Sequence, residues 1–217
     1  PRQLDTEASA LLQSFVESLG IRVLVGAAAS ELLGDEHVSD VVLKDGRVIP
    51  AQTVVVAAGV RASFSLAATA GIAVDRGIVV DDHLQTSSTG IYAAGDAAVY
   101  RGYSWAIAPI AQAQARVAAA NMAGEDLTYD VVTPSTTLKI VGIDVASIGE
   151  VNPEGPDYVS LRRLDAARRV YRKIVLKDDI IVGTIAINDK NLAKDLESRI
   201  SQKARLTHAE AEALVSS

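Results

Sequence analysis

The character of the sequence changes after Gly124, and this change constrains the fold more than any other feature. Before it, apolar segments alternate with helix-like patterns, which is typical of α/β structure. After it, strand-like segments follow one another with turn residues between them, which predicts an antiparallel sheet and then two helices. The predicted strands are 136–140, 144–148, 158–164, 168–176 and 180–188, and the predicted helices are 191–203 and 207–215. We therefore place a domain boundary near residue 126.

The first fifty residues predict a helix followed by a meander of short strands. Apolar residues recur at helical spacing between positions 5 and 19, with Asp5 as the N-cap and Gly20 as the stop. The predicted strands are 21–25, 29–33, 38–44 and 47–49. Asp45-Gly46 lies between the last two, and this dipeptide is a strong signal for a hairpin turn.

Three apolar runs predict buried strands of an α/β sheet. Residues 53–58 form a continuous apolar run that ends at Gly59, so we expect both faces of this strand to be covered. Residues 78–80 and 91–94 are two more short runs, and an alanine-rich helix is expected at 109–122. Pro109 lies near the first turn of that helix, where proline is tolerated.

The most informative residues are Gly95 and Asp96, which follow the third apolar run. Ligands of parallel sheets bind where strands end and helices begin. Glycine there allows close approach to the backbone, and a carboxylate accepts hydrogen bonds from sugar or polyol hydroxyls. The residues alone indicate a polyol-bearing ligand at a sheet edge, and a simple N-cap role for Asp96 stays open.

Composition excludes several classes of function. The formal net charge of −6 argues against a nucleic-acid partner, which would require a basic surface. The chain has no cysteine, so it holds no disulfide, thiolate metal site or thiol redox pair, and its three scattered histidines predict no metal site. No apolar stretch approaches the roughly 20 residues of a membrane span. We expect a cytoplasmic protein without a membrane partner.

The segment around Asp96 resembles the second FAD motif of the FAD-dependent pyridine nucleotide-disulfide oxidoreductase superfamily. It reads Thr86-x4-Ile91-Tyr92-Ala93-Ala94-Gly95-Asp96. Three further segments are similar to superfamily elements in the same order: Pro1–Asp5 to the segment after the strand that holds the adenine ribose of NAD, Val54–Arg61 to the exit from the NAD(P)H domain, and Pro109–Arg116 to the helix that points at the flavin. The general texture is most similar to nitrite reductase large subunit-like and rubredoxin reductase-like members.

The resemblance implies an α/β fold with partial FAD- and NAD(P)-binding Rossmann-like domains, followed by an α+β C-terminal domain with an antiparallel sheet. Residues 1–60 would be the C-terminal part of the NAD(P)H-binding domain. Residues 61–126 would be the returning part of the FAD-binding domain, and residues 127–217 an interface-type domain.

The resemblance also assigns cofactor-binding residues. Asp96 would accept a hydrogen bond from a ribityl hydroxyl of FAD, and Gly95 would leave room for it. Ala108, just before Pro109, would direct its backbone N–H at the pyrimidine edge of the flavin, where a helix N-terminus stabilises negative charge. Gly59 and Arg61 would lie at the domain crossover near the cofactor.

Some superfamily features are missing. Ala62-Ser63 stands where Pro-Asn is common, and Ala115 stands where glycine is common. Neither of the G-x-G-x-x-G loops that hold the pyrophosphates of FAD and NAD(P)H is present. We therefore expect a C-terminal fragment that is inactive alone and binds FAD weakly or not at all.

Three other features have both a functional and a structural interpretation. His208 near Glu210 resembles a His-Glu catalytic base only loosely, and an ordinary helix capped by Thr207 explains it better. Trp105, the only tryptophan, either lies beside the flavin ring or packs at a helix entrance, and we favour packing. Six basic residues form either a docking face for an acidic electron carrier or, as we favour, a solvated hairpin face. They are Arg162, Arg163, Arg168, Arg169, Arg172 and Lys173.

The resemblance implies a parent enzyme that passes hydride from NAD(P)H to FAD and electrons on to an acceptor. The acceptor would be a protein or a small molecule, as in nitrite reductase-like or rubredoxin-type enzymes, and the flavin would supply the redox chemistry. Two alternatives stay open. In the first alternative, the chain is a non-catalytic module that forms a homodimer through its C-terminal domain. In the second, it is a subunit whose partner chain supplies the glycine-rich loops. The sequence does not distinguish NADH from NADPH.

Overall fold

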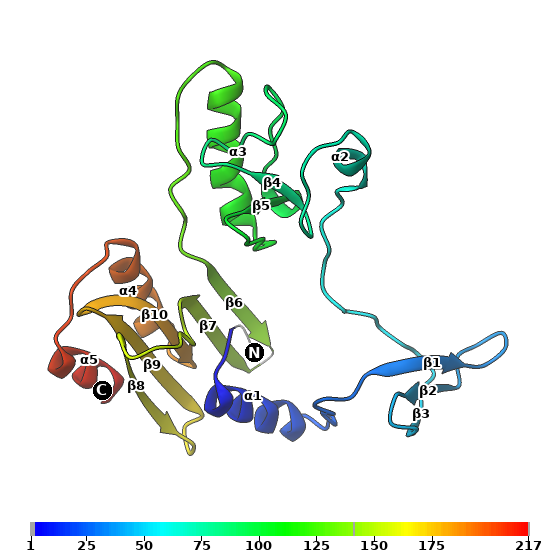
Figure 1. The fold of residues 1–217 in the computed structure, drawn as a ribbon. Helices are drawn as coiled ribbons and strands as arrows, with labels where there is room; N and C mark the ends of the chain where they lie inside the picture. Colours follow the sequence, from blue (N-terminus) through cyan, green and yellow to red (C-terminus); the bar gives the residue numbers. More distant parts are fainter. Residues whose placement is uncertain (1–2, 141, 217) are drawn as a thin grey trace. The chain divides into compact units, whose positions relative to one another are not determined.

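The computed structural model describes residues 3–140 and 142–216 (Figure 1). Pro1 and Arg2, which begin the segment compared with the ribose-holding region, lie outside the described residues. The chain divides into two compact units. The smaller unit is Leu12–Gly59, and the larger one combines Pro1–Leu11 with Val60–Ser217.

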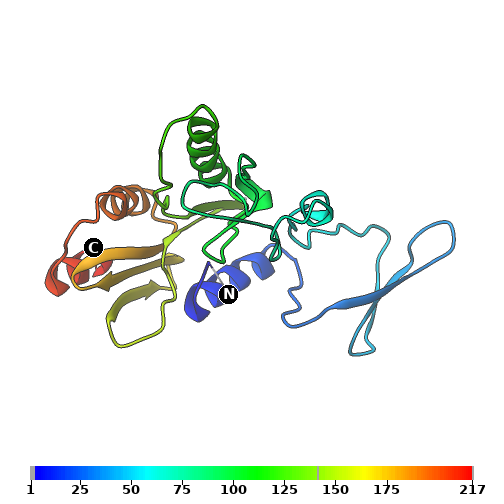
Figure 2. The same cartoon turned by 45° about the horizontal axis from the view of Figure 1, so that its top comes forward.

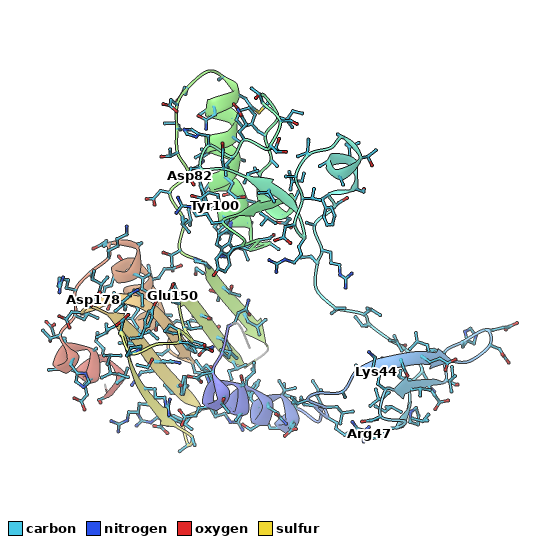
Figure 3. The ribbon with its side chains drawn as sticks, viewed as in Figure 1. Lys44, Arg47, Asp82, Tyr100, Glu150 and Asp178 are labelled. Carbon is cyan, nitrogen blue, oxygen red and sulfur yellow. The ribbon has the colours of Figure 1, made fainter. Side chains whose placement is uncertain are left out.

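The smaller unit contains a three-stranded antiparallel sheet. Its strands β1 (Ala29–Leu33), β2 (Asp40–Leu43) and β3 (Val48–Pro50) are arranged in the order β1-β2-β3. The predicted Asp45-Gly46 turn is confirmed, because Gly46 has a φ of 85° and the Arg47 N–H donates to Asp45 Oδ1 at 3.1 Å. Figure 3 labels Lys44 and Arg47 on either side of this turn.

Two predicted strands of the smaller unit are absent. Residues 21–25 and 53–58 have no strand hydrogen bonding. In the second segment Val55 and Val56 are 84% and 78% exposed, so the prediction of a fully buried strand is wrong. The described part of the chain contains no strand that pairs with this segment, and an apolar run without neighbours cannot bury its side chains or satisfy its backbone in a sheet.

The larger unit begins with an α/β region. It holds the short helix α2 (Ser65–Thr69), the parallel strands β4 (Ile78–Val80) and β5 (Ala98–Tyr100), the 3-10 turn η1 (Gly95–Ala97) and the helix α3 (Ala108–Met122). Helix α3 lies alongside the two strands (Figure 2). Its Ala118 packs with Leu84, Tyr100 and other buried residues into a small core.

The predicted strand 78–80 and the predicted helix 109–122 are confirmed, whereas the predicted strand 91–94 is wrong. Its backbone bonds back to the preceding loop: Ile91 O accepts from the Thr86 N–H at 2.8 Å, and the Ala93 N–H donates to Leu84 O at 3.1 Å. The strand that pairs with β4 is β5, which follows Asp96. Asp96 therefore lies on a turn that enters a strand, and not at a strand end.

The C-terminal region is a five-stranded antiparallel sheet with the order β6-β7-β10-β9-β8. The strands are β6 (Ser135–Ile140), β7 (Ile143–Gly149), β8 (Tyr158–Asp165), β9 (Val170–Lys177) and β10 (Ile180–Ile187). Helices α4 (Lys190–Ser201) and α5 (His208–Ser216) follow. All seven of these elements were predicted from the sequence, because each shows its own periodicity of apolar residues and is bounded by turn residues.

Two helices pack on one face of this sheet, and the start of a third contacts the other. One face carries Ile148, Ile174 and Leu161, which share a core with residues of α4 and α5 such as Leu196 and Ala211. Successive side chains of a strand point to opposite faces, so Tyr171 and Lys173 of β9 lie on the other face. There they contact Asp5 at the start of helix α1 (Thr6–Ser18). The chain is thus an α/β protein with an antiparallel C-terminal sheet, as predicted.

Candidate functional site

The turn at Gly95 and Asp96 is held against helix α3 by a buried side chain. The Gly95 N–H donates to Oε1 of Gln114 at 2.7 Å, and Gln114 is only 1% exposed. Gly95 has a φ of 73°, and a Cβ at this position would lie 3.2 Å from the Cβ of Ala111. Glycine is therefore needed because the turn is left-handed and touches the helix. The space that Gly95 leaves is taken by α3, whereas the sequence analysis reserved it for a ligand.

The carboxylate of Asp96 is exposed and has no partner among the residues that the structure describes. Only its backbone carbonyl is engaged, as an acceptor from Ser104 Oγ at 3.4 Å. The N-cap position of η1 is Ala94 and that of α3 is Ile107, so Asp96 caps neither element. The N-cap interpretation is therefore wrong, and the carboxylate remains available to a ligand.

The N-terminus of α3 presents an open donor near this turn. Pro109 lies in the first turn, and Ile107 provides no side-chain cap. Within residues 3–140 and 142–216 no group accepts the backbone N–H of Ala108, which is exposed together with Pro109. Because Gly95 touches Ala111, one helical turn into α3, the free carboxylate and the free helix N-terminus belong to one local structure.

Two buried amide side chains of α3 organise this region, and the sequence analysis missed both. Gln114 holds Gly95, and Asn121 donates to the carbonyls of His83 and Leu127, each at 2.8 Å. With Ile110 and Ala118 they form the buried stripe of the helix. An amide on the apolar stripe of an alanine-rich helix was the available signal, because a buried amide must find hydrogen-bond partners.

Gly59 and Arg61 lie where the two units of the chain join. Gly59 is the last residue of the smaller unit, with a φ of 88° and open space around its Cα. Arg61 is exposed in the larger unit. The Cβ of the next residue, Ala62, lies 3.4 Å from a Cβ built on Gly77. The same built Cβ lies 2.9 Å from the carbonyl oxygen of Ala97. Arg61 thus precedes a residue packed near η1, whereas Gly59 has no described contact with the site.

An aromatic pair occupies the loop between β5 and α3. The rings of Tyr103 and Trp105 stack with centroids 5.6 Å apart. Trp105 packs against the small core that contains Tyr100 and Ala118, which is the packing role favoured from the sequence.

A polar cluster stabilises the base of the same loop. Asp82 accepts from Tyr100 Oη at 2.8 Å and forms an ion pair with Arg101 at 2.9 Å. Figure 3 shows Asp82 and Tyr100 close together on this part of the chain. The hydrogen bond from Tyr100 and the guanidinium of Arg101 lower the pKa of Asp82 below its usual range. Asp82, Tyr100 and Arg101 are therefore tied to one another.

A polar depression of about 250 Å³ lies at the other end of α3. It is lined by Asp81, His83, Gln85, Tyr92, Asn121, Glu125 and Asp126. His83 Nε2 is 2.9 Å from Asp126 Oδ1, and Gln85 donates to Tyr92 Oη at 3.0 Å. Since Asn121 lies near the C-terminal end of α3 and Ala108 at its N-terminal end, the depression is separate from the Asp96 site.

Several of the six basic residues predicted as one face form ion pairs within the chain. Arg162 pairs with Glu7 at 2.8 Å, Arg172 with Asp189 at 2.7 Å and Lys173 with Asp5 at 3.0 Å. Four of the six, Arg162, Arg163, Arg168 and Arg169, are exposed, as the solvated hairpin face predicts, whereas Lys173 is buried and departs from that prediction.

His208 begins α5, where Thr207 and Glu210 form a reciprocal cap. Glu210 accepts from the N–H and the hydroxyl of Thr207, both at 2.8 Å, as in a capping box. These hydrogen bonds lower the pKa of Glu210. The ordinary helix start is confirmed.

Two classes of site find no support in the described residues. Across 3–140 and 142–216, no helix is both long and apolar enough to cross a bilayer. The same residues contain no group of three or more histidine, aspartate or glutamate side chains that could hold a metal ion.

Comparison with protein families gives two matches along the chain. Residues 2–122 match the pyridine nucleotide-disulphide oxidoreductase family. Residues 134–204 match the rubredoxin NAD+ reductase C-terminal domain. The first match contains the Asp96 turn and α3, and the second contains β6 to β10 and α4.

Curated relatives are longer than this chain. The chain is 37% identical to "Nitrite reductase [NAD(P)H]" of Bacillus subtilis, with 95% of the chain and 26% of the relative aligned. It is 31% identical to "NADH-rubredoxin oxidoreductase" of Clostridium acetobutylicum, with 92% of the chain and 48% of the relative aligned. The chain therefore spans about a quarter to a half of these relatives.

Solved structures share the fold over almost the whole chain. The NADH:rubredoxin oxidoreductase from Clostridium acetobutylicum aligns with a TM-score of 0.71 and 27% identity, covering 99% of this chain and 52% of that one. The ferredoxin reductase for the CYP199A2 system from Rhodopseudomonas palustris aligns with a TM-score of 0.79 and 26% identity, covering 97% and 53%. Together with the family match over more than half of its residues, these likenesses show that the chain belongs to the pyridine nucleotide-disulphide oxidoreductase family.

Proposed function

We propose that this chain is the C-terminal part of a flavoprotein that passes hydride from NAD(P)H to FAD and electrons on to an acceptor. The relatives are named as NAD(P)H or NADH reductases of nitrite or rubredoxin, and they are two to four times longer than the aligned region. The glycine-rich loops that grip the pyrophosphates of both nucleotides are absent from this sequence. We infer that the remainder of a longer protein, or a partner chain, supplies them.

One observation carries the proposal: a free carboxylate and a free helix N-terminus occur in one local structure. The Asp96 carboxylate accepts no hydrogen bond from the described residues, and the N–H of Ala108 is likewise unpaired. A ribityl chain offers hydroxyl donors to the carboxylate, and the pyrimidine edge of a flavin offers acceptors to the helix N-terminus. The donor and acceptor types therefore fit the flavin.

The chain's own residues would bind and orient the flavin, and FAD would supply the redox chemistry. Gln114 and Ala111 keep the Asp96 turn fixed on α3. Donors that are fixed before reaction need no reorganisation when negative charge develops on the ring. Asp96, Gly95, Ala108 and Pro109 form the proposed contact, and Gly59 and Arg61 are proposed to lie at the domain crossover.

Flavin binding by the longer protein tests the proposal. Loss of a hydrogen bond to a charged group costs about 1.5–3 kcal/mol, so Asp96→Asn should weaken FAD binding roughly 10- to 100-fold. Asp130→Asn is the matched control, because Asp130 is an exposed aspartate of the same unit outside the site. Flavin fluorescence titration measures both variants. Equal affinities for the two variants would remove Asp96 from the site.

The isolated 217-residue chain gives a second test. We expect it to take up FAD weakly or not at all and to oxidise no NAD(P)H. A stoichiometric yellow chromophore in the purified chain would contradict the fragment proposal.

The alternative is a homodimerisation module without catalytic function. Helices α4 and α5 cover one face of the C-terminal sheet, and β6 and β8 are the edge strands to which a second copy would add. Leu138 on β6, and Val159 and Leu164 on β8, are 44–45% exposed. Sedimentation equilibrium of the chain with Val159→Lys and Leu164→Lys tests for a dimer through β8. Only a dimer that uses this edge would dissociate in the variant.

A further inference from the structure

A buried charge cluster joins the start of α1 to the C-terminal sheet. Tyr171 Oη donates to Asp5 Oδ2 at 2.6 Å, and Lys173 Nζ lies 3.0 Å from the same oxygen. Lys173 Nζ also donates to Asn152 Oδ1 at 3.1 Å. The side chains of Lys173 and Asp5 are only 7% and 15% exposed, and Tyr171 is fully buried.

The cluster fixes the backbone on both sides of the helix start. Asp5 Oδ1 accepts from the Ala8 N–H at 3.0 Å, which makes Asp5 the N-cap of α1. Asn152 Nδ2 donates to Leu4 O at 3.1 Å, so the residue before the cap is held as well. Within the first turn of α1, Glu7 pairs with Arg162 at 2.8 Å. Together these contacts fix the first turn of α1 in a single position on the sheet.

The partners come from different regions of the chain. Asp5 belongs to the segment matched to the pyridine nucleotide-disulphide oxidoreductase family, at residues 2–122. Asn152, Tyr171 and Lys173 belong to the segment matched to the rubredoxin NAD+ reductase C-terminal domain, at residues 134–204. The hydrogen bond from Tyr171 to Asp5 spans 166 positions in sequence.

An apolar contact would hold α1 to the sheet with less desolvation than this cluster. A buried ion pair adds little net stability over apolar residues of similar size, and its best-attested use is to fix one register. Ala8 and Leu11 already supply buried apolar contacts on the same helix. The charged cluster therefore fixes the position of α1 on the sheet and adds little to its stability.

We propose that Lys173 and Tyr171 are positioning residues for the pyridine nucleotide site, acting through Asp5 on the chain that enters α1. This inference rests on the proposed function, because it requires that the region before α1 serves NAD(P)H. The C-terminal domain then holds the nucleotide-binding region in place through the cluster of Asp5, Asn152, Tyr171 and Lys173, which we call the brace. Loosening the cluster displaces the entrance of α1 while the sheet and the Asp96 site stay intact.

Hydrogen exchange on the 217-residue chain tests the brace itself. Lys173→Met should raise the exchange rates of the Ala8 and Ser9 amides at least tenfold and leave those of β9 and β10 unchanged. Lys177→Met is the matched control. Lys177 lies on the same strand and the same face, but it donates to Tyr158 Oη at 3.4 Å and has no contact with Asp5 among the described residues. Unchanged rates at α1, or equal acceleration throughout the sheet, would overturn the brace.

Kinetics of the longer protein tests the consequence for NAD(P)H. Lys173→Met and Tyr171→Phe should raise the KM for NAD(P)H about five- to tenfold, with kcat and FAD content unchanged, and Lys177→Met should do neither. A changed exchange pattern with an unchanged KM would overturn the positioning role and leave the brace as structural. A wild-type protein that does not oxidise NAD(P)H would refute the proposed function, and the positioning role with it, without altering the exchange result.

Discussion

Residues 53–58 and the Ile174-Val175-Leu176 run of strand β9 are both apolar, yet they lie in opposite environments. Val55 and Val56 are 84% and 78% exposed, whereas Ile174 and Val175 are fully buried. Strand β9 lies between β8 and β10, and helices α4 and α5 pack on one of its faces. The segment 53–58 has no pairing strand in the described part of the chain. An apolar run becomes a buried strand only where the chain supplies neighbours for its edges and faces.

The largest expected effect comes from truncating an apolar side chain in each region. Ile174→Ala should lower the free energy of unfolding by about 2–5 kcal/mol, because it leaves a cavity in a closed core. Val55→Ala should change it by less than about 0.5 kcal/mol, because its side chain is in solvent. Urea unfolding of the chain measures both. Similar losses in the two variants would show that residues 53–58 are packed in solution.

A second test concerns the start of α1, which acquires its partners from the distant sheet. The hydrogen bonds from Tyr171 and Ala8 and the charge of Lys173 outweigh burial and lower the pKa of Asp5. A carboxylate with a lowered folded-state pKa stabilises the fold above its unfolded pKa of about 3.9, and this stability is lost as the pH falls through the lower folded value. Asp5→Asn should cost about 3 kcal/mol at pH 7, because it leaves the Lys173 charge buried without its counter-ion.

The pH profile provides the control for that test. Unfolding measured between pH 6 and pH 2 should show a loss of stability in the wild type that is smaller in Asp5→Asn. Parallel profiles for the two proteins would mean that Asp5 is solvated, and that the start of α1 resembles residues 53–58 more than β9.

The smallest expected effect distinguishes two glycines of the α/β region. Gly95 and Gly90 have similar φ values of 73° and 79°, but only Gly95 would place a Cβ against a neighbour, 3.2 Å from Ala111. Both alanine variants carry the left-handed strain of about 1–2 kcal/mol, and Gly95→Ala should lose about 1 kcal/mol more through the crowded contact. Thermal unfolding measures the difference. Equal losses would show that the Asp96 turn is not pressed against α3.

Features coded by neighbouring residues could be predicted from the sequence. The Asp5 cap, the Asp45-Gly46 turn and the C-terminal strands depend on local periodicity and turn chemistry, and the structure has them all. The exposure of residues 53–58 could not be predicted, because the burial of an apolar run depends on neighbouring strands that the run itself does not encode. Strand β5 was missed because the apolar run at 91–94 was interpreted as the strand of this segment.

The candidate site was predicted in its residues but not in its geometry. Gly95, Asp96 and the Pro109 helix were identified from a motif, and the structure brings the turn and the helix together. The clamp by Gln114 joins positions 19 apart, and the Asp5–Tyr171 contact joins positions 166 apart. Such contacts are set by tertiary packing, for which a single sequence carries no local signal.

The most direct measurement is a crystal structure of the longer protein with FAD bound. The proposal predicts that the Asp96 carboxylate lies within about 3 Å of a ribityl hydroxyl, and that the Ala108 N–H faces the pyrimidine edge of the flavin. A flavin bound elsewhere, with Asp96 directed to solvent, would contradict the assignment of this site.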